Sequence, residues 1–132
     1  MRTFTRVVYA VFGILAIGLG ALVLARPELA LPPDASTPLT THLIREQGAE
    51  GVFIGLMSFW CLFHFDQRRP VHYALLAFTV LFAAIHWADY FGDRRHLASP
   101  LVNTVPVVLF LVTAPFRSEA QRSLTPPTGP PA

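Results

Sequence analysis

The sequence predicts an all-α fold, an antiparallel bundle of four transmembrane helices. Three observations support it: 53% of the 132 residues are hydrophobic, only 14% are charged, and the apolar residues fall into four long segments. A soluble domain usually carries about 25% charged residues, so this chain lacks the polar surface that water requires. The high apolar fraction also excludes a disordered chain.

Charge and cysteine content exclude further classes. The net charge is +2, and the ten basic residues are all Arg and are scattered, so no nucleic acid is expected as a partner. A single Cys, Cys61, permits no internal disulfide and no cysteine-based metal site. The partner that the composition favours is the lipid bilayer.

The membrane domain is expected over residues 1–116, with spans at about 7–25, 43–65, 71–91 and 97–116. The first segment has nineteen residues without a charge, close to the ~20 that cross a bilayer. The second is uncharged only from Gly51 onward, so a span of full length places Glu46 and Glu50 in or beside the bilayer.

The connections between the segments also predict helices. Residues 66–70 and 92–96 are short turns, which make successive helices antiparallel neighbours. Ser99-Pro100 is a typical N-cap and first-turn pair, and Pro106 is expected to kink the fourth helix. The prolines of residues 26–42 predict an extended, irregular connection, and the Pro-rich residues 117–132 predict a disordered cytoplasmic tail.

Arginine counts predict the orientation. With four spans, one side holds six Arg and the other holds four, which places both termini in the cytoplasm of a multi-pass protein. The first segment has an alternative reading as a cleaved signal peptide, because charged residues precede it and Val23-Leu24-Ala25 is a possible cleavage site. Its length exceeds that of a usual signal peptide and favours retention.

Polar residues form stripes on two of the predicted helices. His72, Thr79, His86 and Asp93 recur every seven residues and therefore share one helical face. On the second helix, Glu46 and Glu50 share a side with Phe53, Met57 and His64, whereas Gly48, Gly51, Gly55 and Ser58 lie on the other side. The glycines predict close packing, either against the first helix, which carries Gly13 and Gly20, or in a homodimer or with a partner membrane protein.

Antiparallel packing is expected to bring polar groups together near the outer ends of the second and third helices. The predicted cluster comprises Arg45, Glu46, Glu50, His86, Asp89 and Asn103. Its possible roles are to fix helix register, to bind a metal or relay protons, or to line a cleft for a lipid or quinone. The metal candidates are Glu50, His86 and Asp89, although no established metal-binding motif is present.

One pair of histidines could bind a cofactor. His64 and His72 could ligate a haem between facing helices, but both lie near predicted helix ends, where they can reach the interface without a ligand. Aromatic residues near the helix ends, with Tyr9 among them, fit an interfacial belt. The cofactor therefore stays unknown at this point, with haem as one alternative.

The layout resembles small four-helix bacterial membrane proteins of the DoxX-like type and related families of unknown function. The residues that carry the resemblance are Arg45-Glu46, then Gly48 and Gly51, and Arg68-Arg69 in a short loop. It implies a protein of the bacterial inner membrane and carries no catalytic residue. The first hypothesis is a binding or accessory subunit that is not an enzyme. The alternatives are a metal, proton or redox site, and an enzyme or transporter with a cleft lined by Phe53, Met57, Thr79 and Phe82.

Overall fold

The structure is a computed structural model, and its description covers residues 1–31, 33–92, 94 and 97–115. Within these residues the chain forms four α-helices, two short 3-10 helices and no strand. The helices are α1 (Arg2–Ala25), η1 (Pro27–Leu29), η2 (Pro33–Ala35), α2 (Pro38–Phe63), α3 (Arg69–Gly92) and α4 (Ala98–Val112). The all-helical class is confirmed, whereas the predicted disorder of residues 117–132 lies outside the described part.

The connection before α2 is shorter than the sequence predicted. The expectation of an irregular segment over residues 26–42 is wrong at its end, since α2 already begins at Pro38. Thr37 caps this helix: its side chain accepts a hydrogen bond from the Thr40 backbone N–H, and the Thr40 side chain accepts one from the Thr37 backbone. A reciprocal cap followed by proline in the first turn is a strong helix start.

The start of α4 also differs from the prediction. Leu97 occupies the N-cap position, so Ser99 lies inside the first turn and does not cap the helix. Its hydroxyl group instead lies 3.0 Å from Nδ1 of His86 on α3. The helix includes Pro106 and ends at Val112, four residues before the predicted end of the span.

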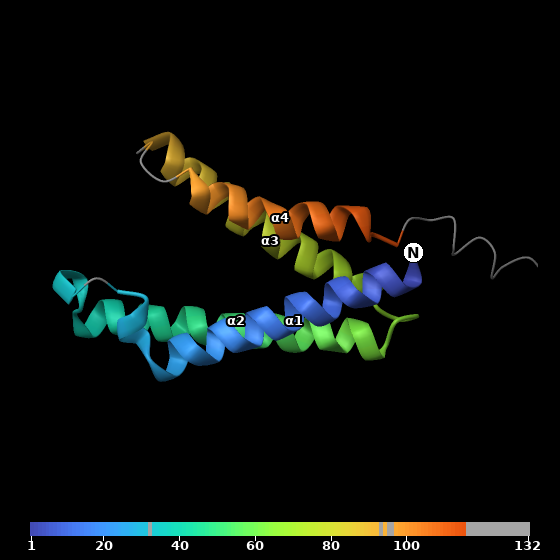
Figure 1. Cartoon of the computed structure of the whole chain (residues 1–132), viewed down its shortest axis with the longest axis horizontal. Helices are drawn as coiled ribbons and strands as arrows, with labels where there is room; N and C mark the ends of the chain where they lie inside the picture. The colour runs from blue at the N-terminus through green and yellow to red at the C-terminus, as the bar shows by residue number, and fades with distance from the viewer. Residues whose placement is uncertain (32, 93, 95–96, 116–132) are drawn as a thin grey trace, which may run out of the picture.

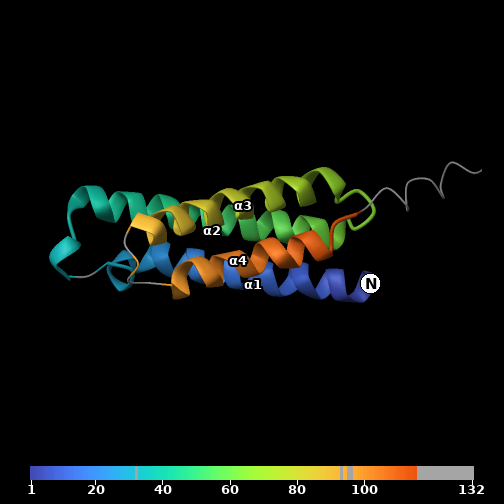
Figure 2. The same cartoon turned by 90° about the horizontal axis from the view of Figure 1, so that it is seen from above.

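The helices pair as two hairpins. The closest packing is of α1 on α2 and of α3 on α4, with fewer contacts between α2 and α3. The two pairs converge where the N-terminus and the α2–α3 turn lie, and they diverge toward the other end (Figure 1). Seen from above, all four helices run alongside one another along the long axis (Figure 2). We call the end where the two pairs converge the closed end, and the end where they diverge the open end.

Glycines on both helices form the seam between α1 and α2. A methyl group at Gly20 would lie 2.6 Å from the Gly48 carbonyl oxygen, and one at Gly55 would lie 2.9 Å from the Gly13 carbonyl oxygen. Both distances are shorter than any side chain tolerates, so the backbones approach closely only because these positions are glycine. The glycine face of α2 therefore packs on the first helix, which is one of the two arrangements expected.

Two of the four helices are long and apolar enough to cross a membrane, α1 and α3. Helix α4 is apolar but has 15 residues, which span only about 23 Å at 1.5 Å per residue. Helix α2 has the length, but Arg45, Glu46 and Glu50 lower the hydropathy of its first half. The length and apolar character of α1 and α3 alone are weak support for a membrane protein.

Candidate functional site: a closed polar hub and an open apolar cleft

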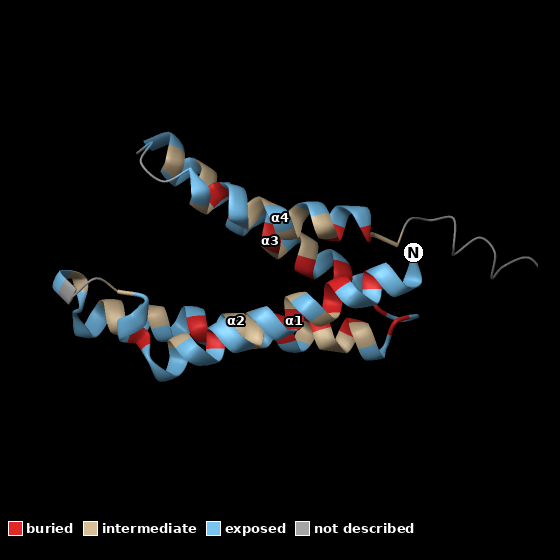
Figure 3. Cartoon of the chain, viewed as in Figure 1, coloured by how far each residue is buried: buried red, intermediate tan, exposed pale blue. Residues whose placement is uncertain are grey.

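A buried polar hub joins all four helices at the closed end. The Tyr9 hydroxyl group on α1 lies 2.6 Å from Nδ1 of His72 on α3, and Nε2 of His72 lies 3.0 Å from the Phe110 carbonyl oxygen on α4. On α2, the Ser58 hydroxyl group donates a hydrogen bond of 2.9 Å to the Tyr9 carbonyl oxygen. All four residues are fully buried, and buried residues gather in this region (Figure 3).

The hub fixes the tautomer of His72. The Phe110 carbonyl can only accept, so Nε2 carries the hydrogen and donates it, and in the neutral ring Nδ1 accepts from the Tyr9 hydroxyl group. Phe110 lies in the last turn of α4, where carbonyl groups have no partner within the helix. The histidine thereby satisfies polar groups on two other helices.

The hub corrects two expectations. Tyr9 does not belong to an interfacial belt and His72 does not reach the interface, because both side chains are fully buried. A haem held by His64 and His72 does not fit these residues, since both ring nitrogens of His72 are hydrogen-bonded. His64 is exposed, stacks on Trp60 and makes a hydrogen bond of 3.2 Å to the Trp60 carbonyl oxygen.

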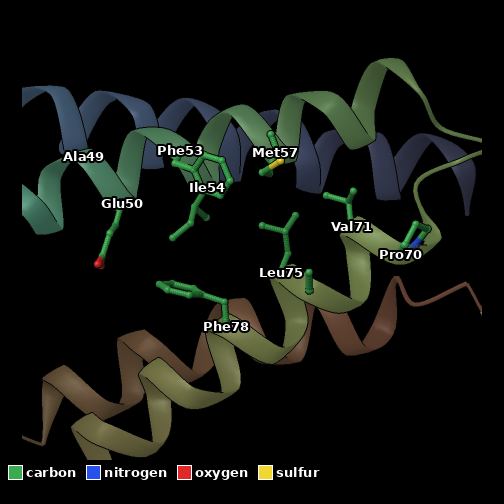
Figure 4. Close-up of a pocket in the computed structure, with 10 residues that line it drawn as sticks. Ala49, Glu50, Phe53, Ile54, Met57, Pro70, Val71, Leu75 and Phe78 are labelled. Carbon is green, nitrogen blue, oxygen red and sulfur yellow. The ribbon is translucent and has the colours of Figure 1, made fainter.

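An apolar cleft of about 740 Å³ opens between α2 and α3. The side chains of Phe53, Ile54, Leu75 and Phe78 point into this space from the two helices (Figure 4). Its size lies within the ~300–1,000 Å³ of typical small-molecule sites. The full lining is Ala49, Glu50, Phe53, Ile54, Met57, Pro70, Val71, Ala74, Leu75 and Phe78.

A smaller chamber of about 190 Å³ adjoins the cleft and reaches α1 and α4. Glu50, Ile54 and Phe78 line both spaces. The smaller chamber is the more polar of the two, with Gln47, Glu50, Thr79 and Asn103 in its wall. The residues expected to line a cleft are thus divided: Phe53 and Met57 line the large space, whereas Thr79 and Phe82 line the small one.

Glu50 is the carboxylate that faces these spaces. Its side chain extends from α2 into the gap between the hairpins (Figure 4). Among the described residues it has no hydrogen-bond or ion-pair partner. Of the predicted cluster, the chamber wall brings together only Glu50 and Asn103.

The other members of the predicted cluster have different neighbours. Oε1 of Glu46 lies 3.2 Å from Nε2 of His42 one turn earlier, and His86 contacts Ser99. Asp89 is exposed. The divergence of the hairpins explains this, because it separates α2 from α3 at the open end, where both sets of side chains lie.

Arg45 lies near the connection that follows α1. The Arg26 guanidinium donates a hydrogen bond to Glu28, which lowers the pKa of that carboxyl group below its usual value, and the charge of Arg45 contributes to the same shift. Arg45 is exposed and does not line the chamber that holds Glu50 and Asn103.

The metal candidates do not gather into a metal site. Within the part of the chain that the structure describes, no three His, Cys, Asp or Glu side chains lie close enough to hold a metal ion. Glu50, His86 and Asp89 stay apart because they lie on opposite sides of the gap between the hairpins.

Sequence reasoning missed the hub, although one signal for it was present. The seven-residue stripe on α3 does face inward at its start, where His72 and Thr79 are buried. The opposite face is exposed at Ala77, Leu81 and Ala84, as the pattern predicts. The sequence offers no comparable signal for the partner atoms, because Ser58 and Tyr9 meet only once the glycine seam has formed.

These features define a small all-helical protein in which two hairpins are joined by a polar hub and separated by an apolar cleft. The chain belongs to a family described as a domain of unknown function (DUF4345), whose model matches residues 4–85. The matched region includes α1, α2 and most of α3, and therefore both walls of the large cleft. A search of curated proteins and one of solved structures found no match.

Proposed function

We propose that this chain is a small integral membrane protein that crosses the bilayer four times. The exposed surfaces support this, because large apolar side chains cover the outward faces of the helices, such as Ile14 and Leu19 (each 61% exposed) and Val102 (67%). Exposed apolar surface on this scale is typical of a membrane contact. The two helices that fail the length or hydropathy criterion, α2 and α4, each pack along one that meets it.

The proposed location is the bacterial inner membrane, with both termini in the cytoplasm. Support comes from the closed end, where Arg2, Arg6 and Arg68 lie around the Phe65 ring at 5.8, 5.1 and 3.7 Å from its centroid. Arg2 also pairs with Asp66 at 3.5 Å. Positive charge concentrated at one end of a membrane bundle is typical of its cytoplasmic side.

The proposal retains α1 in the mature protein. This helix supplies half of the glycine seam, and its Tyr9 is bonded within the hub. Cleavage after Ala25 would remove these contacts and expose the glycine face of α2. The same packing supports the view that the glycine face of α2 packs against α1 and does not form a homodimer. This face comprises Gly48, Gly51 and Gly55.

The function that the geometry supports best is the binding of a hydrophobic molecule from the bilayer, by a protein that acts as a binding or accessory subunit and not as an enzyme. The single observation that carries this proposal is the cleft of about 740 Å³ between α2 and α3. A kinship with DoxX-like proteins stays part of the proposal. It is supported by the four-helix layout and by the residues Arg45-Glu46 and Arg68-Arg69.

The proposal is tested by a substitution that fills the cleft with a large side chain. Ala74 lines it, whereas Ala77 is an exposed residue one turn further along α3 that does not line it. In the purified protein, bound dodecanol is counted by native mass spectrometry for the wild type, Ala74→Trp and Ala77→Trp. We expect Ala74→Trp to lose saturable binding and Ala77→Trp to retain it. Equal binding by the two variants, or none by the wild type, would contradict the proposal.

A further inference from the structure

The wall of the smaller chamber presents hydrogen-bond acceptors. The Asn103 amide nitrogen already donates to the Ser99 carbonyl oxygen at 2.9 Å, which leaves the Asn103 side-chain oxygen to accept. The Thr79 hydroxyl group donates to the Leu76 carbonyl oxygen at 2.9 Å, so its lone pairs are likewise acceptors. Glu50 adds a carboxylate, which accepts only. Gln47, also in the wall, can both donate and accept. Acceptors therefore outnumber donors here, which favours a molecule that brings donors.

The charge of Glu50 narrows the choice of donor. A carboxylate near the bilayer interior is costly unless an opposite charge lies beside it. No charged group pairs with Glu50 among the described residues, and Glu46, one turn earlier, lies 3.2 Å from Nε2 of His42. A protonated amine supplies both the charge and three N–H donors, which the Glu50 carboxylate and the Thr79 and Asn103 oxygens can accept.

Resting on the proposed binding function, we propose that the two connected spaces hold an amphiphile with a protonated amine head and an alkyl tail. The amine lies in the smaller chamber against Glu50, and the tail occupies the apolar cleft lined by Phe53, Met57 and Leu75. Glu50, Ile54 and Phe78 line both spaces, so the head and the tail would meet beside them. This assigns a ligand class to the site and makes Glu50 its recognition residue.

The test compares three amphiphiles that share one alkyl chain: dodecylamine, dodecanol and dodecanoate. Their binding to the purified protein is measured by native mass spectrometry at neutral pH. We expect dodecylamine to bind at least about ten-fold more tightly than dodecanol, as one charged hydrogen bond allows, and dodecanoate to bind most weakly. Glu50→Gln should abolish the preference for the amine, so that the variant binds dodecylamine and dodecanol about equally.

Glu46→Gln is the matched control, because Glu46 lies one turn away on α2 and lines neither space. It should keep the amine preference. Equal binding of the amine and the alcohol by the wild type, or a preference that survives Glu50→Gln, would overturn the inference and leave the proposed function standing. If the wild type binds none of the three amphiphiles, both the inference and the proposed function are overturned.

Discussion

Replacement of His72 by leucine should destabilise the protein strongly, since it removes the centre of the hub. The substitution removes the closest partner of two buried groups, the Tyr9 hydroxyl group and the Phe110 carbonyl. An unsatisfied buried polar group costs about 1–3 kcal/mol, which gives a total of about 2–6 kcal/mol. The Thr113 hydroxyl group donates to the Leu109 carbonyl oxygen at 2.7 Å and also lies 3.4 Å from the Phe110 carbonyl oxygen, so it can partly replace His72 and we expect the lower half of that range.

A double-mutant cycle separates the hydrogen bond from the packing. Tyr9→Phe removes the hydroxyl group alone and should cost about 1–3 kcal/mol, because Nδ1 of His72 loses its donor. When Tyr9→Phe is added to His72→Leu, no unpaired hydroxyl group remains, so the double variant should be less unstable than the sum of the single variants. Hydrogen bonds measured within membranes couple by about 0.6 kcal/mol on average and by up to about 1.7 kcal/mol.

The assay is reversible unfolding in mixed micelles, followed by the fluorescence of Trp60 and Trp87. A coupling free energy of about 0.6–1.7 kcal/mol is the expected result. Additivity within about 0.3–0.5 kcal/mol would refute the direct Tyr9–His72 bond, since independent sites behave in that way. The cycle is informative even if each single variant is only partly folded at low denaturant.

Two further predictions concern α1. Gly20→Val should disrupt the seam and lower the thermal stability, because a methyl group there already meets the Gly48 carbonyl oxygen at 2.6 Å, whereas Gly18→Val should be tolerated since nothing lies within 4 Å of that position. Equal losses in the two variants would argue against the seam. The purified protein should also retain residues 1–25 when its intact mass is measured, and a mass that begins after Ala25 would contradict the role assigned to α1.

The helices could be predicted from the sequence more fully than their ends. Long apolar segments and short turns were enough to find four helices, because hydrophobic length and chain breaks are local properties. The Thr37-Pro38 start of α2 is equally local, and it was overlooked because the neighbouring prolines favoured an irregular reading. The prediction that Ser99 caps α4 is wrong because its hydroxyl group contacts His86 on another helix. A contact of that kind cannot be inferred from the local sequence.

The position of the candidate site along the helices could be predicted from the sequence, but the contacts between its residues could not. Glu50 and Asn103 do line one chamber, as their matching depth on antiparallel helices suggested. His86 and Asp89 do not join them, because the angle between the hairpins is set by the tertiary packing at the closed end. Likewise, whether His72 faced lipid or the core depended on where α1 crosses α3, which periodicity on one helix cannot reveal.

The polar residues at the two ends of the molecule differ in whether they have hydrogen-bond partners. At the closed end, Tyr9, Ser58 and His72 satisfy one another and the Phe110 carbonyl, so their removal should reduce stability. At the open end, Glu50 is left without a partner among the described residues while it faces an apolar space, so its removal should change binding instead. Its position in the wall of both spaces is the observation on which the proposed recognition role rests.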